Sequence, residues 1–255
     1  LVSLSGNDLL LHNFGPDSAE AAESMAALDA GIGELLAMLD RTVGRERYVF
    51  ALTADHGGGP AIEVAQARGL GGGRMDLKKM KAQLDAKLSA KFGGREWVQA
   101  FTESGIYLRE DGGADPDAVR AEAAKALLAM EGVVQVFRRG APAEWQQTSE
   151  GRAAARGYSA RHGGDLVAAL APYWIWEEDC ASHGSGYAYD TRVPVLVRGP
   201  GVQGARFGRR VDPIDLPVTL AALAGLPPPG AAEGEVLREV FDAHDGWKRT
   251  AAQKK

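Results

Sequence analysis

Apolar and polar residues follow each other along the chain in blocks that predict strands and helices in turn. Short, nearly continuous apolar runs are typical of strands buried on both faces of a parallel sheet, and here they occupy residues 1–5, 48–53, 133–137, 165–175 and 193–197. Apolar residues that recur every three or four positions predict amphipathic helices, in this chain over residues 18–40, 75–92, 116–130, 214–224 and 237–242. Two further short runs, 97–101 and 105–108, predict a hairpin, and residues 251–255 predict a solvated tail.

This alternation of strands and helices predicts an α/β fold, with a doubly wound, mostly parallel sheet that carries helices on both faces. We expect residues 1–74 and 165–255 to form parts of this core. Residues 75–164 combine a basic helix, a hairpin and a poorly periodic polar stretch, and they predict a smaller inserted α+β cap. The first long helix is expected to begin after Asp17 or Ser18, because both residue types are good N-caps.

The composition excludes several classes of protein. With 45% hydrophobic and 25% charged residues among 255, the chain is typical of globular proteins and unlike disordered or collagen-like ones. A net charge of −5 gives no sign of nucleic-acid binding, and the longest apolar stretch, 166–176, is interrupted by Pro172 and too short to cross a bilayer. We therefore expect neither nucleic acid nor a membrane as a partner. The single cysteine, Cys180, cannot form an internal disulfide; we expect a buried small hydrophobic residue, with a Cys-x-x-His ligand pair as the alternative.

Potential metal ligands occur at three places along the chain, each after a predicted strand. Asp8 and His12 are four residues apart and share a face if the loop forms a helical turn. Asp55 and His56 are adjacent, and His183 lies in a loop of serine and glycine. Because the carboxyl ends of strands form the ligand crevice of an open α/β sheet, we expect these side chains to converge. Two carboxylates and three imidazoles suit Zn²⁺, whereas a capped turn is the alternative for an isolated Asp-His pair.

Three motifs resemble those of a known family. They are residues 5–18 (Ser-Gly-Asn-Asp…His-Asn-Phe-Gly-Pro-Asp-Ser), 53–57 (Thr-Ala-Asp-His-Gly) and 183–201, which contains His-Gly-Ser, Tyr-Asp-Thr, Val-Pro-Val-Leu and Gly-Pro-Gly. Together they resemble the alkaline phosphatase superfamily, in particular the bacterial alkaline phosphatases of the branch related to nucleotide pyrophosphatases/phosphodiesterases. Residues 161–166 (Arg-His-Gly-Gly-Asp-Leu) resemble that branch's Arg-Ser-Gly-Asp segment. The resemblance covers nearly the whole chain, but only the C-terminal part of the family's catalytic domain.

The resemblance implies two Zn²⁺ ions, with another divalent ion as the alternative in one site. One ion would be bound by Asp8, His12 and His183, and the other by Asp55 and His56. The family's nucleophilic Thr or Ser, and the residues that bind the phosphate oxygens, would lie upstream of the first residue. No catalytic nucleophile is therefore expected within this chain.

The chain's own hydroxyl groups offer no substitute for that nucleophile. Thr53 is expected to be a strand-end hydroxyl that bonds to the backbone. Ser182 and Ser185 flank His183, but the Gly-x-Ser-x-Gly elbow of a Ser-His-Asp triad is absent. Asp190 is expected to orient a metal ligand and not to bind the metal itself.

The activity that the resemblance implies is zinc-dependent hydrolysis of phosphate monoesters through a phospho-enzyme. It would take place in the periplasm or outside the cell, although the chain carries no signal peptide. The partners would be the phosphate ester and the missing N-terminal part of the same enzyme. Residues 187–191 and 193–197 favour the monoesterase over the alternative, a phosphodiesterase or nucleotide pyrophosphatase. A third possibility is that the chain on its own is an inactive metal-binding fragment.

Overall fold

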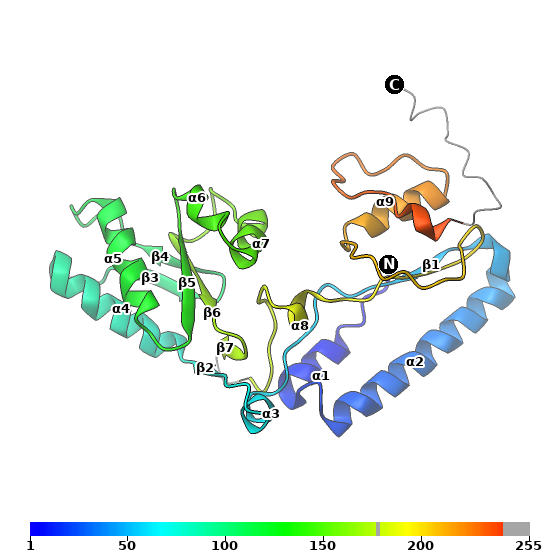
Figure 1. Cartoon of the computed structure of the whole chain (residues 1–255), viewed down its shortest axis with the longest axis horizontal. Coiled ribbons are helices and arrows are strands. Elements are labelled where there is room, and N and C mark those ends of the chain that lie inside the picture. Colours follow the sequence, from blue (N-terminus) through cyan, green and yellow to red (C-terminus); the bar gives the residue numbers. More distant parts are fainter. Residues whose placement is uncertain (177–178, 242–255) are drawn as a thin grey trace. The chain divides into compact units, whose positions relative to one another are not determined.

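The computed structural model describes residues 1–176 and 179–241, and it divides the chain into two compact units (Figure 1). Unit 1 consists of Leu1–Met25 and Gly58–Thr191, and unit 2 of Ala26–Gly57 and Arg192–Lys255. Helices and strands alternate along the chain, which confirms the predicted α/β class. The predicted tail at 251–255 lies outside the described residues, and the boundaries of the inserted cap stay a prediction.

The framework of unit 1 is a four-stranded antiparallel sheet in the order β3-β4-β6-β5. The hairpin predicted from residues 97–108 is confirmed, because Phe101 pairs with Ile106 and Thr102 with Gly105. Two helices, α4 and α5, lie side by side against this sheet (Figure 1). The bounds are β3 Val98–Thr102, β4 Gly105–Leu108, β5 Val133–Arg138, β6 Leu166–Leu170, α4 Leu77–Phe92 and α5 Pro116–Leu128.

A continuous apolar core fills the space between these helices and the sheet. Helix α4 contributes Leu84 and Leu88, which are four residues apart and therefore on one face, and both are completely buried. Trp97 packs beside them and is 1% exposed. The start of α4 is capped by Asp76, whose carboxylate accepts a hydrogen bond from the backbone N–H of Lys79. The helix predicted over residues 75–92 is confirmed, and its start lies at Leu77 because Asp76 caps it.

The rest of unit 1 includes several short elements. They are α1 (Gly6–Phe14), α3 (Ile62–Ala67), α6 (Pro142–Trp145), α7 (Ser149–Gly157), α8 (Ala188–Thr191), and the parallel pair β2 (Gly73–Met75) and β7 (Trp174–Trp176). Helices α6 and α7 lie in the stretch 138–164 that the sequence marked only as polar and poorly periodic.

Two predicted strands of unit 1 differ from the structure. Residues 1–5 form no strand, and α1 begins directly after them at Gly6. Their apolar side chains are exposed in the described structure, so no sheet partner holds them extended. The run 165–175 is divided into β6 and β7 by a turn, in which Tyr173 adopts a positive φ of 64°. An apolar run predicts burial, but it does not reveal such a change of direction.

Unit 2 is built around the antiparallel pair β1 (Phe50–Leu52) and β8 (Leu196–Arg198). Helix α2 (Ala19–Leu39) begins in unit 1 and continues into unit 2, where a π-helical turn, Asp40–Gly44, and a 3₁₀ turn, Arg45–Arg47, follow it. Helix α9 (Asp215–Leu223) and a 3₁₀ turn at Arg238–Val240 complete the described part. Strand β1 is only half-buried. For these residues the prediction of a parallel strand buried on both faces is wrong, because the described partner runs antiparallel.

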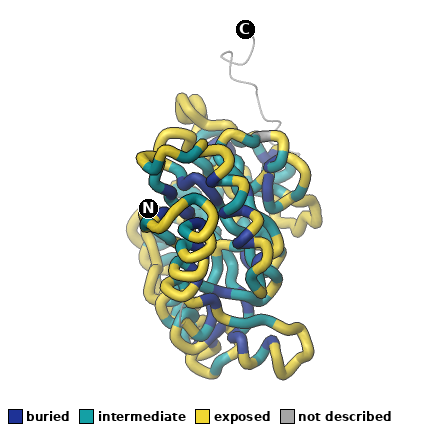
Figure 2. Tube along the Cα trace, turned by 90° about the vertical axis from the view of Figure 1, so that its left-hand side faces the viewer, coloured by how far each residue is buried: buried dark blue, intermediate teal, exposed yellow. Residues whose placement is uncertain are grey.

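Helix α2 confirms the predicted helix and its start. The side chain of Ser18 accepts a hydrogen bond from the backbone N–H of Ala21, as an N-cap does. Its apolar stripe is only half-buried, however, and Figure 2 shows buried residues (dark blue) as short stretches in a trace that is mostly intermediate or exposed. Among the described residues, no helix combines the length and apolar character of a membrane span.

Candidate metal centre

Helix α1 brings Asp8 and His12 together. Residues four positions apart lie on the same face of a helix, and Asp8 Oδ1 lies 3.7 Å from His12 Nε2. The helix ends before Gly15, whose φ of 78° is left-handed and whose N–H donates to the carbonyl of Leu11. A Cβ atom at Gly15 would lie 3.0 Å from the Cβ of Ala61, so only glycine allows the chain to pass so close to that residue.

His183 reaches the same carboxylate from a distant loop of unit 1. Its Nε2 lies 3.7 Å from Asp8 Oδ1, and its ring centre lies 5.0 Å from that of His12. One ligand atom from each of the three side chains lies within 4.8 Å of the other two. The side chains are 46%, 23% and 32% exposed for Asp8, His12 and His183, so solvent and a substrate can reach the group.

The loop that carries His183 is held by the buried Asp190 of α8. The carboxylate of Asp190 accepts hydrogen bonds from the backbone N–H of Ser185, at 2.7 Å, and from the Ser185 hydroxyl. Ser185 follows His183 by two residues, with Gly184 between them at a φ of 94°. Asp190 therefore contacts the loop of His183 through the backbone N–H and the hydroxyl of Ser185. Beside it, burial raises the pKa of the Tyr189 hydroxyl.

His12 is enclosed by residues 179–181. Its Nδ1 lies 3.1 Å from the carbonyl oxygen of Ala181 and 3.2 Å from Oδ2 of Asp179. Its own carbonyl oxygen accepts hydrogen bonds from the N–H groups of Cys180 and Ala181. Cys180 is half-buried, and it contributes its backbone here; its thiol is not part of the ligand group among the described residues.

Sequence reasoning missed Asp179, because no motif marks it. The only signal available was an acidic residue four positions before His183. That spacing implies nothing unless the segment is known to fold back on α1.

Asp55 and His56 belong to unit 2, directly after β1, and form a local pair. His56 Nε2 lies 3.8 Å from Asp55 Oδ2, and the backbone N–H of His56 donates to Asp55 Oδ1. The Asp55 side chain is 89% exposed. Nearby, the Thr53 hydroxyl lies 3.4 Å from the carbonyl of Ala54, so its bond is to the backbone, as expected. The role of Asp55 and His56 as ligands of a second ion stays a prediction.

The donor set of Asp8, His12 and His183 fits a divalent cation. Two imidazoles and one carboxylate are a known ligand set of catalytic zinc, which keeps a further position for water or substrate. A metal-binding imidazole must also have a nitrogen without a proton, and His12 fits this requirement. A carbonyl oxygen only accepts hydrogen bonds, so the contact with Ala181 places the proton on Nδ1 and leaves the lone pair of Nε2 for the metal.

Comparison with known proteins places the chain in one family. A family model described as type I phosphodiesterase / nucleotide pyrophosphatase matches residues 1–182. A curated relative from Myroides odoratus, named calcium-transporting ATPase, is 28% identical over 249 residues, and alkaline phosphatase PafA from Elizabethkingia meningoseptica is 25% identical over 249 residues. Each match covers 94% of this chain and 45% of the relative, so the chain spans about half the length of these relatives.

The fold is also similar to a solved structure. A crystal structure of a PafA mutant superposes with a TM-score of 0.85 and 25% identity, over 94% of this chain and 46% of that one. The described residues therefore have the fold of the corresponding part of PafA.

Proposed function

Since this chain belongs to the type I phosphodiesterase / nucleotide pyrophosphatase family of the alkaline phosphatase superfamily, we propose that it supplies metal ligands for zinc-dependent hydrolysis of phosphate monoesters. The observation that carries the proposal is the convergence of Asp8, His12 and His183 within 4.8 Å. The name of PafA, an alkaline phosphatase, supports the choice of monoesters. Because the chain covers only 45% of that relative, the activity is proposed for the full-length protein.

The side chains would act by binding and orienting. A divalent cation bound here would supply positive charge that attracts phosphate oxygens and stabilises negative charge on the leaving oxygen. Asp8 offers its carboxylate between the two imidazoles, and His12 holds a proton at Nδ1 so that Nε2 is available. Half-exposed ligands leave an open approach for a phosphate ester. Asp55 and His56 would bind the second ion, and the nucleophilic hydroxyl is predicted outside residues 1–255.

Metal binding by the chain tests the proposal without any assay of catalysis. Zn²⁺ is titrated into the metal-free chain against a chromogenic chelator. We expect one tight equivalent, and a loss of at least about 100-fold in affinity in Asp8→Ala and His183→Ala, because each removes a ligand. His162→Ala is the matched control, since this exposed histidine lies outside the ligand group. Unchanged affinity in both ligand variants would contradict the assignment.

The substrate class is tested by turnover. The full-length protein with Zn²⁺ is expected to hydrolyse a phosphate monoester faster than a diester. The description of the matching family model favours the second candidate, a phosphodiesterase or nucleotide pyrophosphatase. Faster turnover of the diester would establish that candidate instead.

A third experiment addresses the chain by itself. Residues 1–255 alone are expected to bind Zn²⁺ and to release no phosphate from either substrate, because the nucleophile is predicted elsewhere. Phosphate release that a chelator abolishes would contradict this expectation. By the same resemblance we propose a periplasmic or secreted location, which fractionation of cells that express the full-length protein would test.

A further inference from the structure

We infer that Asp179 is a positioning residue that orients His12 for metal binding. The inference rests on the proposed metal site, and it assigns a role to a side chain outside the family's motifs. Asp179 is not one of the three converging ligands. Its carboxylate lies on the opposite edge of the His12 ring, 3.2 Å from Nδ1, while Nε2 lies 3.7 Å from Asp8.

The geometry matches a hydrogen-bonded metal ligand. A histidine that binds metal through one nitrogen generally donates its other N–H to a carboxylate or a carbonyl, which orients the ring and raises its basicity. The His12 Nδ1 hydrogen bond is to the Ala181 carbonyl at 3.1 Å, and the Asp179 carboxylate lies 3.2 Å from the same nitrogen as an ion-pair partner. The carbonyl is sufficient to select the tautomer. Asp179 adds negative charge next to the Nδ1–H, which strengthens the Nε2 lone pair as a donor.

Asp179 is itself held in place by a charged pair. Arg74 of β2 donates from Nε to the backbone carbonyl of Asp179 at 2.9 Å. The same guanidinium binds Glu63 of α3 through two nitrogens, at 2.8 and 3.3 Å, and this contact lowers the pKa of Glu63. Because Arg74 is anchored by Glu63, the backbone of Asp179 is fixed from one side.

The segment around Asp179 is also attached to His12 through its backbone. The N–H of Cys180 donates to the His12 carbonyl at 3.0 Å, and the Cys180 carbonyl accepts from Ile62 of α3. The acidic side chain therefore stands on a segment bonded to both α1 and α3. This makes its position beside His12 a property of the fold and distinguishes it from a chance ion pair at the surface.

Zinc affinity of the metal-free chain tests the inference. Asp179→Ala is expected to weaken Zn²⁺ binding about tenfold. This is the lower end of the loss in metal affinity expected when a residue that orients a metal ligand is removed, because the Ala181 carbonyl still holds His12. Asp179→Asn keeps an acceptor oxygen and should recover part of the loss, to about threefold. Asp17→Ala is the control: its side chain is 42% exposed against 49% for Asp179, and it also contacts a cation, Arg68, at 3.2 Å. The control should bind Zn²⁺ as the wild type does.

A spectroscopic measurement separates positioning from general stability. In the zinc-loaded chain, the proton on His12 Nδ1 should resonate further upfield in Asp179→Asn than in the wild type, because the charged acceptor is gone. Equal affinity of Asp179→Ala and Asp17→Ala, with an unmoved resonance, would overturn the inference. Failure of the wild type to bind Zn²⁺ would instead overturn the proposed function, so the two failures are distinguishable.

Discussion

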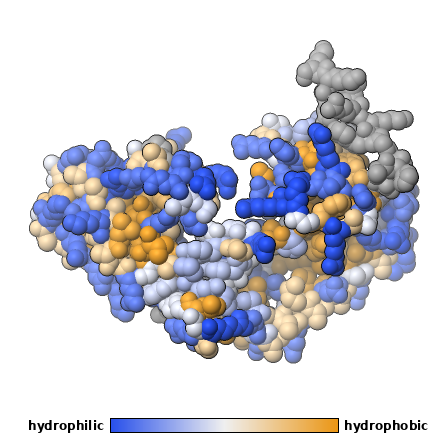
Figure 3. Space-filling model, viewed as in Figure 1, coloured by the Kyte–Doolittle hydropathy of each residue, from blue (hydrophilic) through white to orange (hydrophobic). Residues whose placement is uncertain are grey.

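The two units differ in how far their apolar residues are buried. Unit 1 encloses a core in which Leu84, Leu88 and Trp97 are 0–1% exposed. In the described part of unit 2, the buried apolar side chains are Leu216, Val218 and Leu237. The apolar stripe of α2 is half-buried, and apolar surface (orange) is visible on both units in Figure 3. The apolar patterns thus predicted helices and strands in both units. They did not predict how much of the apolar surface of each unit would be buried.

The largest expected effect tests the core of unit 1. Leu84→Ala should destabilise this unit by about 3 kcal/mol, because it removes a fully buried side chain and leaves a cavity. Urea unfolding followed by far-UV circular dichroism measures the change, because this signal comes from the helices and strands of both units. Leu196→Ala in unit 2 is the control; this residue is 54% exposed, and its replacement should cost less than about 0.5 kcal/mol. Similar losses in both variants would refute the contrast between the units.

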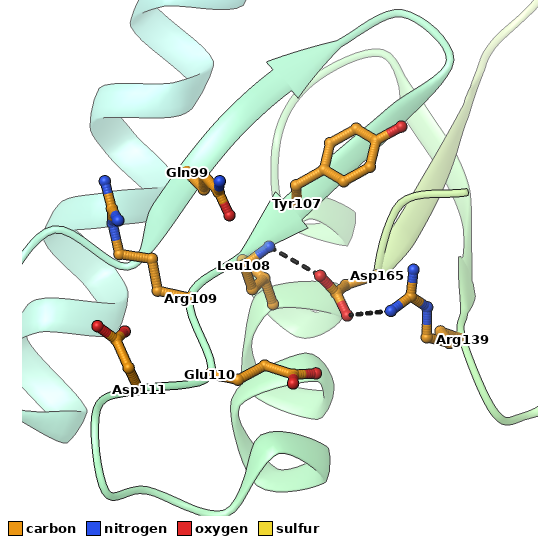
Figure 4. Close-up of a pocket in the computed structure, with 8 residues that line it drawn as sticks. All are labelled: Gln99, Tyr107, Leu108, Arg109, Glu110, Asp111, Arg139 and Asp165. Atoms are coloured by element: carbon orange, nitrogen blue, oxygen red, sulfur yellow. Dashed lines mark hydrogen bonds and ion pairs between the residues drawn. The ribbon is translucent and has the colours of Figure 1, made fainter. Parts of the chain in front are cut away.

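A buried ion pair in unit 1 gives the next effect. The Asp165 carboxylate accepts from the Leu108 N–H at 2.8 Å and from Arg120 Nε at 3.0 Å, and Arg139 lies beside it in a pocket of about 430 Å³ (Figure 4). Asp165→Asn should cost about 2 kcal/mol, because Asn has one acceptor oxygen where the buried carboxylate has two, so the bond to Leu108 or to Arg120 is lost. Asp117→Asn is the control, because Asp117 also binds Arg120 but is 84% exposed. Equal costs in the same urea experiment would show that burial does not matter here.

Unit 2 has a smaller buried polar contact of its own. The hydroxyl of the fully buried Thr219 donates to the Asp215 carbonyl and accepts from the N–H of Leu237. Thr219→Val leaves that N–H without its partner and should cost about 1–2 kcal/mol. Hydrogen exchange at Leu237 measures the change. Thr42→Val removes an exposed hydroxyl that donates to Met38, and it should leave this exchange unaltered; faster exchange in both variants would contradict the prediction.

The smallest effect concerns a partly exposed contact of unit 2. The Tyr48 hydroxyl donates to Asp40, and this bond, with the nearby Arg198, lowers the pKa of Asp40 from its ordinary 3.8. A lowered folded-state pKa means that the contact stabilises the unit above pH 3.8 and that this contribution is lost as the pH falls through the folded pKa. Tyr48→Phe should raise the pKa of Asp40 toward 3.8, measured by carboxyl NMR titration.

The control for this titration is Tyr107→Phe. Tyr107 lies in unit 1, where its hydroxyl donates to the His162 carbonyl. The pKa of Asp40 should not move in this variant. If it does not move in Tyr48→Phe either, the tyrosine is not the cause of the lowered pKa.

Local elements of the fold were predictable from the sequence wherever their determinants are close in the chain. Apolar residues on one face predicted helix α4, and two short runs with a brief turn predicted the β3–β4 hairpin. The division of 165–175 into β6 and β7 was not predictable, because the run is apolar throughout. Which neighbour covers an apolar run depends on the whole fold.

The same distinction between local and long-range determinants holds for the candidate site. The sequence by itself predicted that Asp8 and His12 share a face if their segment is helical, because residues four positions apart lie on one side of a helix, and α1 is that helix. Only the tertiary structure decided that His183 meets the same carboxylate and that Asp179 lies behind His12. Those contacts join residues far apart in the chain, and their free energy depends on the packing of both segments. A motif can name such a ligand by resemblance, but a residue outside every motif, such as Asp179, is found only in the folded chain.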